Sequence, residues 1–430
     1  MNTKDWNIFI LGLGFFLVYT GYLTIVGCSE TILRSYRNRT GETDVNGFVS
    51  LALYSSTNSI MSIFSPVLMS LMSRKYLMLL GGVITACYCA VFIKPIPALL
   101  YVFSALSGCG AAFLWIGRGS EFVINSTKKT LHRNASIFFA MYMSGSFGGN
   151  IYVFYAWKGR TIIDQSEQNL LAIIMSGITL LGALSFLLLK NNEEGKVVKQ
   201  KDVGEELRTY LFSAWEMAKN KDVLLLMPLM AEIGILICFY SIVLPTCVGT
   251  TPDLPDSKSL MGLAVLMVGV GELLATFVQV LHSKHFIQLG SAFCLLIYSL
   301  ITFYLTFPDT CTLHATTTPG IISPQKYSIL ISALAIGYFD CTTQVAMNRA
   351  IGSCFKAEWE TAGAYVWVGI LLAGSVGVAS LYATVLTLSV QIIILLVFVL
   401  LALICLVKLE MEYTARRTRH NTQCSLEKPE

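Results

Sequence analysis

Twelve stretches of this chain are each long and apolar enough to cross a lipid bilayer, which takes about 20 mostly apolar residues in a helix. No soluble fold of 430 residues could hide so many apolar runs. We therefore predict an all-α membrane protein with twelve transmembrane helices. The expected spans are 6–27, 47–72, 76–94, 98–117, 135–157, 169–190, 222–248, 258–281, 286–307, 326–348, 358–381 and 384–407.

Composition supports the membrane class and argues against catalysis. Only 13% of the residues are charged, whereas soluble domains carry about 25%. The net charge of +4 is too small to indicate a nucleic-acid partner. The chain has no phosphate-binding loop before a strand and no serine nucleophile elbow. The five His and twelve Cys are scattered, so we expect no enzyme, no metal site and no cofactor.

A polar segment divides the apolar runs into two sets of six. Residues 190–221 contain no long apolar run and hold seven basic residues. Two six-helix halves joined by a basic linker are typical of transporters. We therefore predict a first half at 1–190, a linker at 191–221, a second half at 222–408 and a tail at 409–430.

The distribution of Lys and Arg predicts the orientation. With both termini and the linker in the cytoplasm, the inner side holds 22 of the 30 basic residues, as the positive-inside rule requires. The protein is then a multi-pass protein of the plasma membrane or an endomembrane. Of three glycosylation sequons, Asn38 alone lies on the predicted outer side, whereas Asn125 and Asn134 lie inside and should stay unmodified.

Small residues follow the second, fifth, eighth and eleventh expected spans. Such residues let helix backbones approach closely inside a membrane, so we expect these helices to pack around a central axis. The last span is apolar on all sides and is expected to face lipid. The small residues are Ser55, Ser56, Ser59 and Ser62; Gly145, Gly148 and Gly149; Gly269 and Gly271; and Gly369, Gly374 and Gly377.

Three carboxylates fall inside predicted spans of the second half: Glu232, Glu272 and Asp340. A charged side chain at mid-bilayer costs at least about 2.5–3.5 kcal/mol, so each needs a reason. One hypothesis is a cation, proton or substrate site in a central cavity. Three neutral amide side chains are further candidates for that site. The alternative is that the acids stay protonated and join helices through hydrogen bonds. The neutral members are Asn58, Asn150 and Gln344.

A family resemblance runs through nearly the whole chain. Its motifs are Gly108-x-Gly110-Ala111-Ala112-x-x-Trp115-x-Gly117, Asn134-x-x-x-Phe138-Phe139, Gly148-Gly149-Asn150, Gly269-x-Gly271-Glu272 and Gly337-x-x-Asp340-x-x-x-Thr343-Gln344. In this order and spacing they resemble the Unc-type ("uncoordinated") family of ion-channel regulatory proteins, a branch of the major facilitator superfamily. The resemblance implies the twelve-helix major facilitator fold. It lends no role to Glu232 or Arg118, because relatives often carry an acid or amide where Leu236 stands and Gln where Arg118 stands.

The inner gate differs from that of typical facilitators. Their second-to-third loop carries an Asp that this chain lacks, although basic Arg74 and Lys75 remain. Arg118 and Glu121, three residues apart at the inner end of the fourth span, are expected to pair or to lie in solvent. These four residues are the candidates for an inner gate.

Two functions remain open at this point. The resemblance implies a regulatory or trafficking subunit of an ion channel, similar to potassium-channel regulators, or of another membrane protein. The acid-bearing interior instead favours a secondary active transporter of a cation or small organic solute, working by alternating access. The fold does not decide between them. The expected partners are the lipid bilayer, a channel subunit or other membrane protein, and a cation or small solute.

Overall fold

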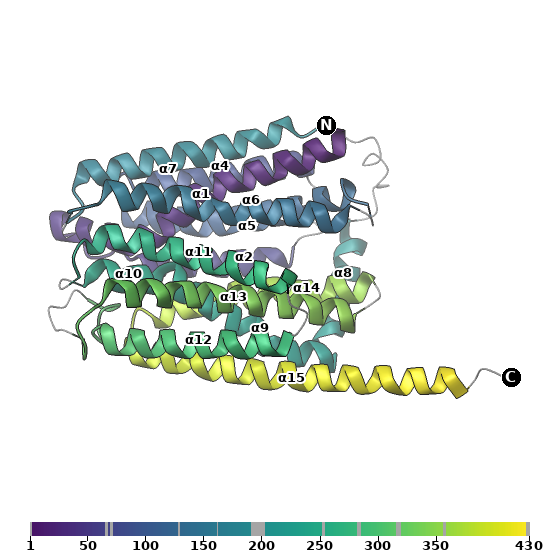
Figure 1. Cartoon of the computed structure of the whole chain (residues 1–430). Helices are drawn as coiled ribbons and strands as arrows, with labels where there is room; N and C mark the ends of the chain where they lie inside the picture. The colour runs from purple at the N-terminus through teal and green to yellow at the C-terminus, as the bar shows by residue number, and fades with distance from the viewer. Residues whose placement is uncertain are drawn as a thin grey trace.

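The computed structural model describes residues 2–64, 68, 72–127, 130–160, 162–190, 203–251, 254–281, 285–314, 320–355 and 358–426. These residues form helices and connecting turns without any strand, and most of the helices run side by side in one bundle (Figure 1). The elements are α1 (Thr3–Thr40), α2 (Gly47–Ser62), α4 (Arg74–Val91), α5 (Pro97–Ile124), α6 (Leu131–Ala156), α7 (Gln165–Ser185), η1 (Phe186–Leu188), α8 (Val203–Ala218), α9 (Lys221–Cys238), η3 (Phe239–Val243), α10 (Leu244–Thr250), α11 (Ser257–Leu281), α12 (His285–Thr306), α13 (Lys326–Cys354), α14 (Glu358–Tyr382) and α15 (Leu388–Leu426).

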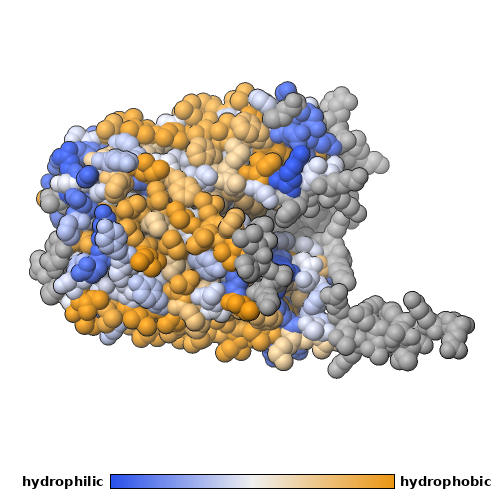
Figure 2. Space-filling model, in the orientation of Figure 1, coloured by the Kyte–Doolittle hydropathy of each residue, from blue (hydrophilic) through white to orange (hydrophobic). Residues whose placement is uncertain are grey.

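The bundle has an apolar flank and polar ends, as a protein that crosses a bilayer requires. Ten of the described helices are long and apolar enough to cross a membrane. The other two predicted spans contain α2, with sixteen described residues, and α6, whose Gly, Ser, Asn and Tyr residues dilute its hydropathy. Figure 2 shows hydrophobic residues along the flank of the bundle and hydrophilic ones gathered at its two ends. By length and hydropathy, ten of the twelve predicted spans are thus confirmed.

The helices pack as two groups with a seam between them. Helix α1 packs against α6 and α7, and α4 against α5 and α7. In the second group α11 and α12 pack against α13, and α9 packs against α14 and α15. The seam consists mainly of two pairs, α2 with α14 and α6 with α11. These four helices are the ones with the predicted small residues, and the prediction that they pack around the axis is confirmed.

Small residues set the spacing of the seam. A Cβ on Gly377 would lie 2.8 Å from Ser56 Oγ, and one on Gly262 would lie 2.7 Å from the Asn150 carbonyl. The Ser59 hydroxyl, also on α2, donates to the Ile370 carbonyl of α14 at 2.9 Å. Such close backbone approach lets van der Waals contacts and hydrogen bonds join the helices where lipid offers no hydrophobic drive.

Both termini lie at one end of the bundle, together with α8 (Figure 1). We call this the proximal end and the opposite one the distal end. Helix α15 continues well past the predicted span and tail boundary, to Leu426, and projects beyond the bundle. Ion pairs stabilise its extension: Glu410 binds Arg349 at 2.7 Å, and Arg416 binds Asp222 at 2.8 Å. Helix α8 lies within the predicted linker, of which residues 191–202 are outside the described part.

Helix α9 runs into α10 through a π-helical segment, η3. Pro245 lies in the first turn after it. A proline has no N–H to donate back along the helix, and its ring crowds the carbonyl four residues earlier, which is that of Ser241. A wider π turn relieves this clash, and π segments recur at functional sites. The segment contains Tyr240, whose side chain lies near the buried acids described next.

Candidate functional site

The three predicted acids come from three different helices of the second group and lie near one another. Glu232 is on α9, Glu272 on α11 and Asp340 on α13. Glu232 and Asp340 are fully buried, and 9% of Glu272 is exposed. The Asp340 carboxylate interacts electrostatically with both glutamates. The structure therefore brings together the acids that the sequence placed in three different spans of the second half.

Glycines explain how α11 and α13 bring two of these acids close. A Cβ on Gly271 would lie 2.0 Å from the Leu334 carbonyl oxygen, and one on Gly337 would lie 1.9 Å from that of Val268. The two backbones touch at these positions, and any larger residue would push them apart. Glu272 directly follows the first glycine, and Asp340 lies three residues after the second, so both acids lie near the crossing point.

The acids have few partners among the described residues. Gln344 donates from Nε2 to Asp340 Oδ2 at 2.7 Å, which one turn of α13 allows. Both carboxylate oxygens of Glu232 and Oδ1 of Asp340 are buried without a hydrogen-bond partner. No ion pair joins any of the three acids to a described Lys or Arg. Because an unpaired buried carboxylate is costly, this arrangement suits a group that receives a proton or a cation.

Two predicted neutral members do not join the acids. Asn150 is buried, donates to the Ser146 carbonyl at 2.7 Å and packs against α11 at Gly262. That glycine precedes Glu272 by ten residues, or about 15 Å of helix. Asn58 is on α2, in the seam with α14, and no described contact links it to an acid. Of the predicted amides, only Gln344 contacts the site. The sequence shows how deep a residue lies along its helix, but it does not show how the helix is rotated about its axis.

The proposed inner-gate residues lie near the proximal end, in different surroundings from those expected. Glu121 binds Arg74 at 2.9 Å, linking α5 to α4 within the first group. It also accepts from Asn125 Nδ2 at 3.0 Å. Lys75 donates to the Leu189 carbonyl at 3.4 Å. Neither of the two alternatives for Glu121, a pair with Arg118 or a position in solvent, describes it: Glu121 is 7% exposed and pairs with Arg74.

Arg118 instead lies among aromatic rings. Its guanidinium carbon is 4.3–5.8 Å from the centroids of four rings, and its Nε is buried without a partner. Cation–π attraction to these rings stabilises the guanidinium, while the buried Glu121 on the same helix is bound by Arg74 instead. The four rings belong to Trp115, Phe122, Phe138 and Phe139.

The sequence of this chain is similar to those of known membrane proteins. A sequence model described as "Ion channel regulatory protein UNC-93" matches residues 40–407. The chain belongs to the UNC-93 family. It is 28% identical to the UNC93-like protein MFSD11 of Xenopus tropicalis, over 98% of this chain and 99% of that protein. It is also 28% identical to the UNC93-like protein MFSD11 of Xenopus laevis, over 92% and 94% of the two chains.

Solved structures place this UNC-93 family member in the fold of the major facilitator transporters. A mutant of the peptide transporter POT in complex with alafosfalin has a TM-score of 0.64, with 15% identity over 93% of each chain. A POT family transporter in complex with 5-aminolevulinic acid also has a TM-score of 0.64, with 12% identity over 92% of this chain and 95% of that one. These similarities show the fold alone.

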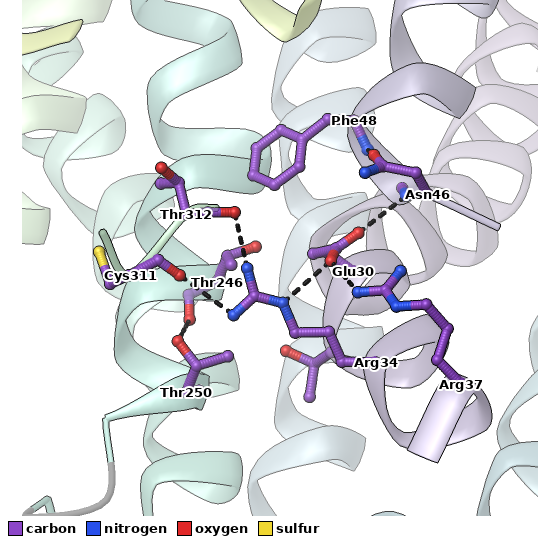
Figure 3. Close-up of polar contacts among 12 residues, drawn as sticks. Glu30, Arg34, Arg37, Asn46, Phe48, Thr246, Thr250, Cys311 and Thr312 are labelled. Atoms are coloured by element: carbon purple, nitrogen blue, oxygen red, sulfur yellow. Dashed lines mark hydrogen bonds and ion pairs between the residues drawn. The ribbon is translucent and has the colours of Figure 1, made fainter. Parts of the chain in front are cut away.

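The chain also has a second buried polar cluster, which we did not predict from the sequence. At the distal end of α1, Glu30 Oε1 accepts from Arg34 Nε at 2.9 Å and from Arg37 at 2.7 Å (Figure 3). The other oxygen, Oε2, accepts from the Gly47 amide at 2.8 Å. Glu30 is 2% exposed and Arg34 is 8% exposed. Every oxygen of this carboxylate is thus bound, unlike those of the acids in the second group.

Arg34 also joins the two groups of helices. Its two terminal nitrogens donate to the carbonyls of Cys311 at 3.1 Å and Thr312 at 2.6 Å, in the segment after α12 (Figure 3). The Glu30–Arg34 spacing of four residues in an apolar helix was a readable signal for the ion pair. Nothing in the sequence pointed to the carbonyls, which lie more than 270 residues away.

Proposed function

We propose that this protein is a non-enzymatic regulatory or trafficking subunit that binds another membrane protein, with an ion channel as the first candidate. The observation that carries this proposal is the family match over residues 40–407, whose printed description is that of an ion channel regulatory protein. We place both termini in the cytoplasm, because Lys and Arg are concentrated on that side. In this orientation the Arg74–Glu121 pair lies on the cytoplasmic side and Asn38 faces outward.

Electrophysiology with matched surface measurements tests the regulatory proposal. Currents from a panel of potassium-channel subunits would be recorded in cells with and without this protein, and the surface density of each channel would be measured in the same cells. A regulator should change the current or the surface density of at least one member. Unchanged currents and densities across the panel, with this protein verified at the membrane, would contradict the proposal.

A second candidate function is secondary transport of a cation or small organic solute. The specific observation in its favour is the group of Glu232, Glu272 and Asp340, which has unpartnered oxygens and no described basic partner. The printed titles of two fold neighbours name small solutes that those transporters bind. On this proposal Asp340 receives the proton or cation, Gln344 orients it through its hydrogen bond, and the glutamates share the charge.

Comparing amide with alanine variants separates this site from a structural role. Asp340→Asn keeps the shape and removes the charge, so a cation or proton site should lose its pH- and cation-dependent thermal stabilisation while surface delivery is retained. If the acid serves only as a neutral hydrogen-bonding group, the amide should change little. Asp340→Ala should then lower stability by about 0.6–2 kcal/mol. An Asp340→Asn protein with the same pH and cation response as the parent would exclude the site.

A further inference from the structure

The first group of helices holds a half-buried cation without an anion among the described residues. The guanidinium of Arg118 lies 4.3 Å from the ring centre of Phe138 and 4.9 Å from that of Phe122. It makes no hydrogen bond or ion pair with the described residues, and its Nε is buried. Aromatic faces stabilise the charge from the sides. The aromatic rings leave the N–H edge of the guanidinium free. That edge can donate two parallel hydrogen bonds to one carboxylate.

The second group holds anions without a cation. Oδ1 of Asp340 and both oxygens of Glu232 are buried and unpartnered, and Glu272 lies in electrostatic contact with Asp340. Unpaired groups of opposite sign thus occur on the two sides of the seam. Leaving each unpaired is costly, so the arrangement favours a ligand that supplies the missing partner to each.

Tyr142 of α6 connects the two sets. It interacts electrostatically with Glu272 and Asp340 on one side and with Arg118 on the other. Arg118 also interacts with Tyr365 of α14, which belongs to the second group. Tyr142, Arg118 and Tyr240 all keep exposed surface, although they lie within the bundle. The cation and the acids therefore border the same region between the two groups.

We infer that this region binds a small amphoteric solute, with its carboxylate at Arg118 and its ammonium group at Asp340 and Glu272. A proton or metal cation alone would satisfy the acids and leave Arg118 unpaired, and a simple anion would do the reverse. A solute with both charges pairs both sides. This inference rests on the second proposed function and names its substrate class.

Contacts between α11 and α13 show that the two acids lie at similar depths. Thr276, one turn after Glu272, has its hydroxyl 3.3 Å from Sγ of Cys341, the residue after Asp340. The offset between the two acids along the bundle axis is therefore no more than about one helical turn, or about 5.4 Å. The two acids can then bind the same ammonium group of a solute.

Fluorescence of Trp115, which borders Arg118, gives a direct binding signal. Purified full-length protein in lipid nanodiscs would be titrated with trialanine, N-acetyl-trialanine and trialanine amide. We expect the free peptide to bind at least tenfold more tightly than either blocked form. Trp115→Phe should remove the signal, which assigns it to this site. Equal affinity for the three peptides, or no binding by any, would overturn the inference.

Variants test each half of the site separately. Arg118→Gln should erase the preference for a free carboxylate, so that trialanine and its amide bind equally. Asp340→Asn should instead erase the preference for a free amino group. Arg160→Gln removes an arginine in an exposed ion pair outside the site and should keep both preferences. The ligand comparison on the parent protein stands even where a variant fails to fold.

Flux measurements separate this inference from the transport proposal. In proteoliposomes, specific binding of trialanine without uptake would leave the binding site intact and contradict the carrier. Cation- or pH-dependent stabilisation lost in Asp340→Asn, without discrimination among the three peptides, would leave the cation site and reject the amphoteric solute. The two outcomes are measured on the same preparation.

Discussion

Buried charges in this protein differ in whether protein atoms satisfy them. At the distal end, the oxygens of Glu30 are bound by Arg34, Arg37 and a backbone amide. In the middle of the bundle, Glu232 has no partner for either oxygen. A satisfied buried pair serves structure, whereas an unpartnered group requires something the chain does not supply. This difference suits the distal cluster to closing the bundle, and it supports the proposal that the central acids bind a ligand.

Arg34→Met tests the closure role. The change removes the contacts with Cys311 and Thr312 and one of two arginines on Glu30, so we expect a loss of about 3 kcal/mol. It should also raise labelling of buried Cys247 and Cys311 by a membrane-impermeant maleimide, measured by mass spectrometry. Arg160→Gln, in an exposed pair, should cost less than about 1 kcal/mol and leave labelling unchanged. Equal labelling in the parent and Arg34→Met would show that Arg34 does not hold the distal end closed.

Sequence reasoning reached the three acids and Gln344 but not the surroundings of Arg118. Glu232, Glu272 and Asp340 stood out because charged residues are rare in apolar spans. Gln344 could also be predicted, because it lies one turn from Asp340. The aromatic surroundings of Arg118 could not be predicted, because Phe138 and Phe139 come from another helix. Contacts within one helix can be read from spacing, whereas contacts between helices depend on rotations that spacing leaves open.

At the scale of elements, α11 and α13 meet through glycine backbones. Gly271→Ala would place a Cβ 2.0 Å from the Leu334 carbonyl oxygen, so we expect a loss of about 1–3 kcal/mol from overpacking. Gly177→Ala is the matched control, because a Cβ there meets nothing within 4 Å. It should be neutral or stabilising by up to about 1 kcal/mol. Thermal unfolding in detergent compares them, and equal midpoints for the two variants would contradict the close crossing.

Asp309 connects the α12–α13 segment to the start of α15. Its Oδ1 accepts from the Ser389 amide at 2.7 Å and from the Ser389 hydroxyl at 2.6 Å. Partial burial raises the pKa of this carboxyl, but the hydrogen bonds from Ser389 and Thr387 outweigh that effect, so the pKa is lowered. A lowered folded-state pKa means stability that is present above the ordinary value of about 3.9 and lost as the pH falls through the folded value.

The lowered pKa of Asp309 determines the pH dependence that we expect for Asp309→Asn. The variant should be less stable than the parent at pH 7, by no more than about 1 kcal/mol because the site is exposed. The difference should shrink as the pH falls from about 4 and vanish below the lowered folded-state pKa, where the parent carboxyl is protonated as well. Thermal midpoints of both proteins across this range provide the measurement. A difference that stays constant with pH would show that the carboxylate charge does not contribute.

Sequence predicted which four helices pack around the axis, but it predicted neither how they pair nor the helical structure of two polar segments. Small residues marked α2, α6, α11 and α14 as the helices that pack around the axis, because close approach requires them. The extension of α15 to Leu426 was missed because its residues are polar and its partners, such as Asp222, lie near the start of α9. Helix α8 was read as part of a polar linker for the same reason.

At the scale of the whole molecule, the two ends of the bundle are joined differently. The distal end has Arg34 across the seam, and α1 packs there against α10 and η3. The proximal ion pairs of the described residues each stay within one group: Arg74 with Glu121, Arg349 with Glu410, and Arg416 with Asp222. This asymmetry indicates a conformation whose distal end is the more firmly closed.

Glycosylation provides a test of which end faces the cytoplasm. Asn38 is exposed in the last turn of α1, at the distal end. Asn125 and Asn134 are each 2% exposed and lie near the proximal end. With the proximal end in the cytoplasm, only Asn38 meets the glycosylation machinery, so Asn38→Gln should abolish the mass shift that a glycosidase removes. The shift itself would be measured by gel mobility before and after enzyme treatment.

Controls for this last prediction remove the other sequons without touching their buried asparagines. Thr127→Ala and Ser136→Ala each destroy one sequon and should leave the glycan in place. Loss of the glycan in either of them, with retention in Asn38→Gln, would put the proximal end outside. The Lys and Arg excess would then lie on the wrong side of the membrane, and the orientation would have to be reversed together with the side from which the acids of the second group are reached.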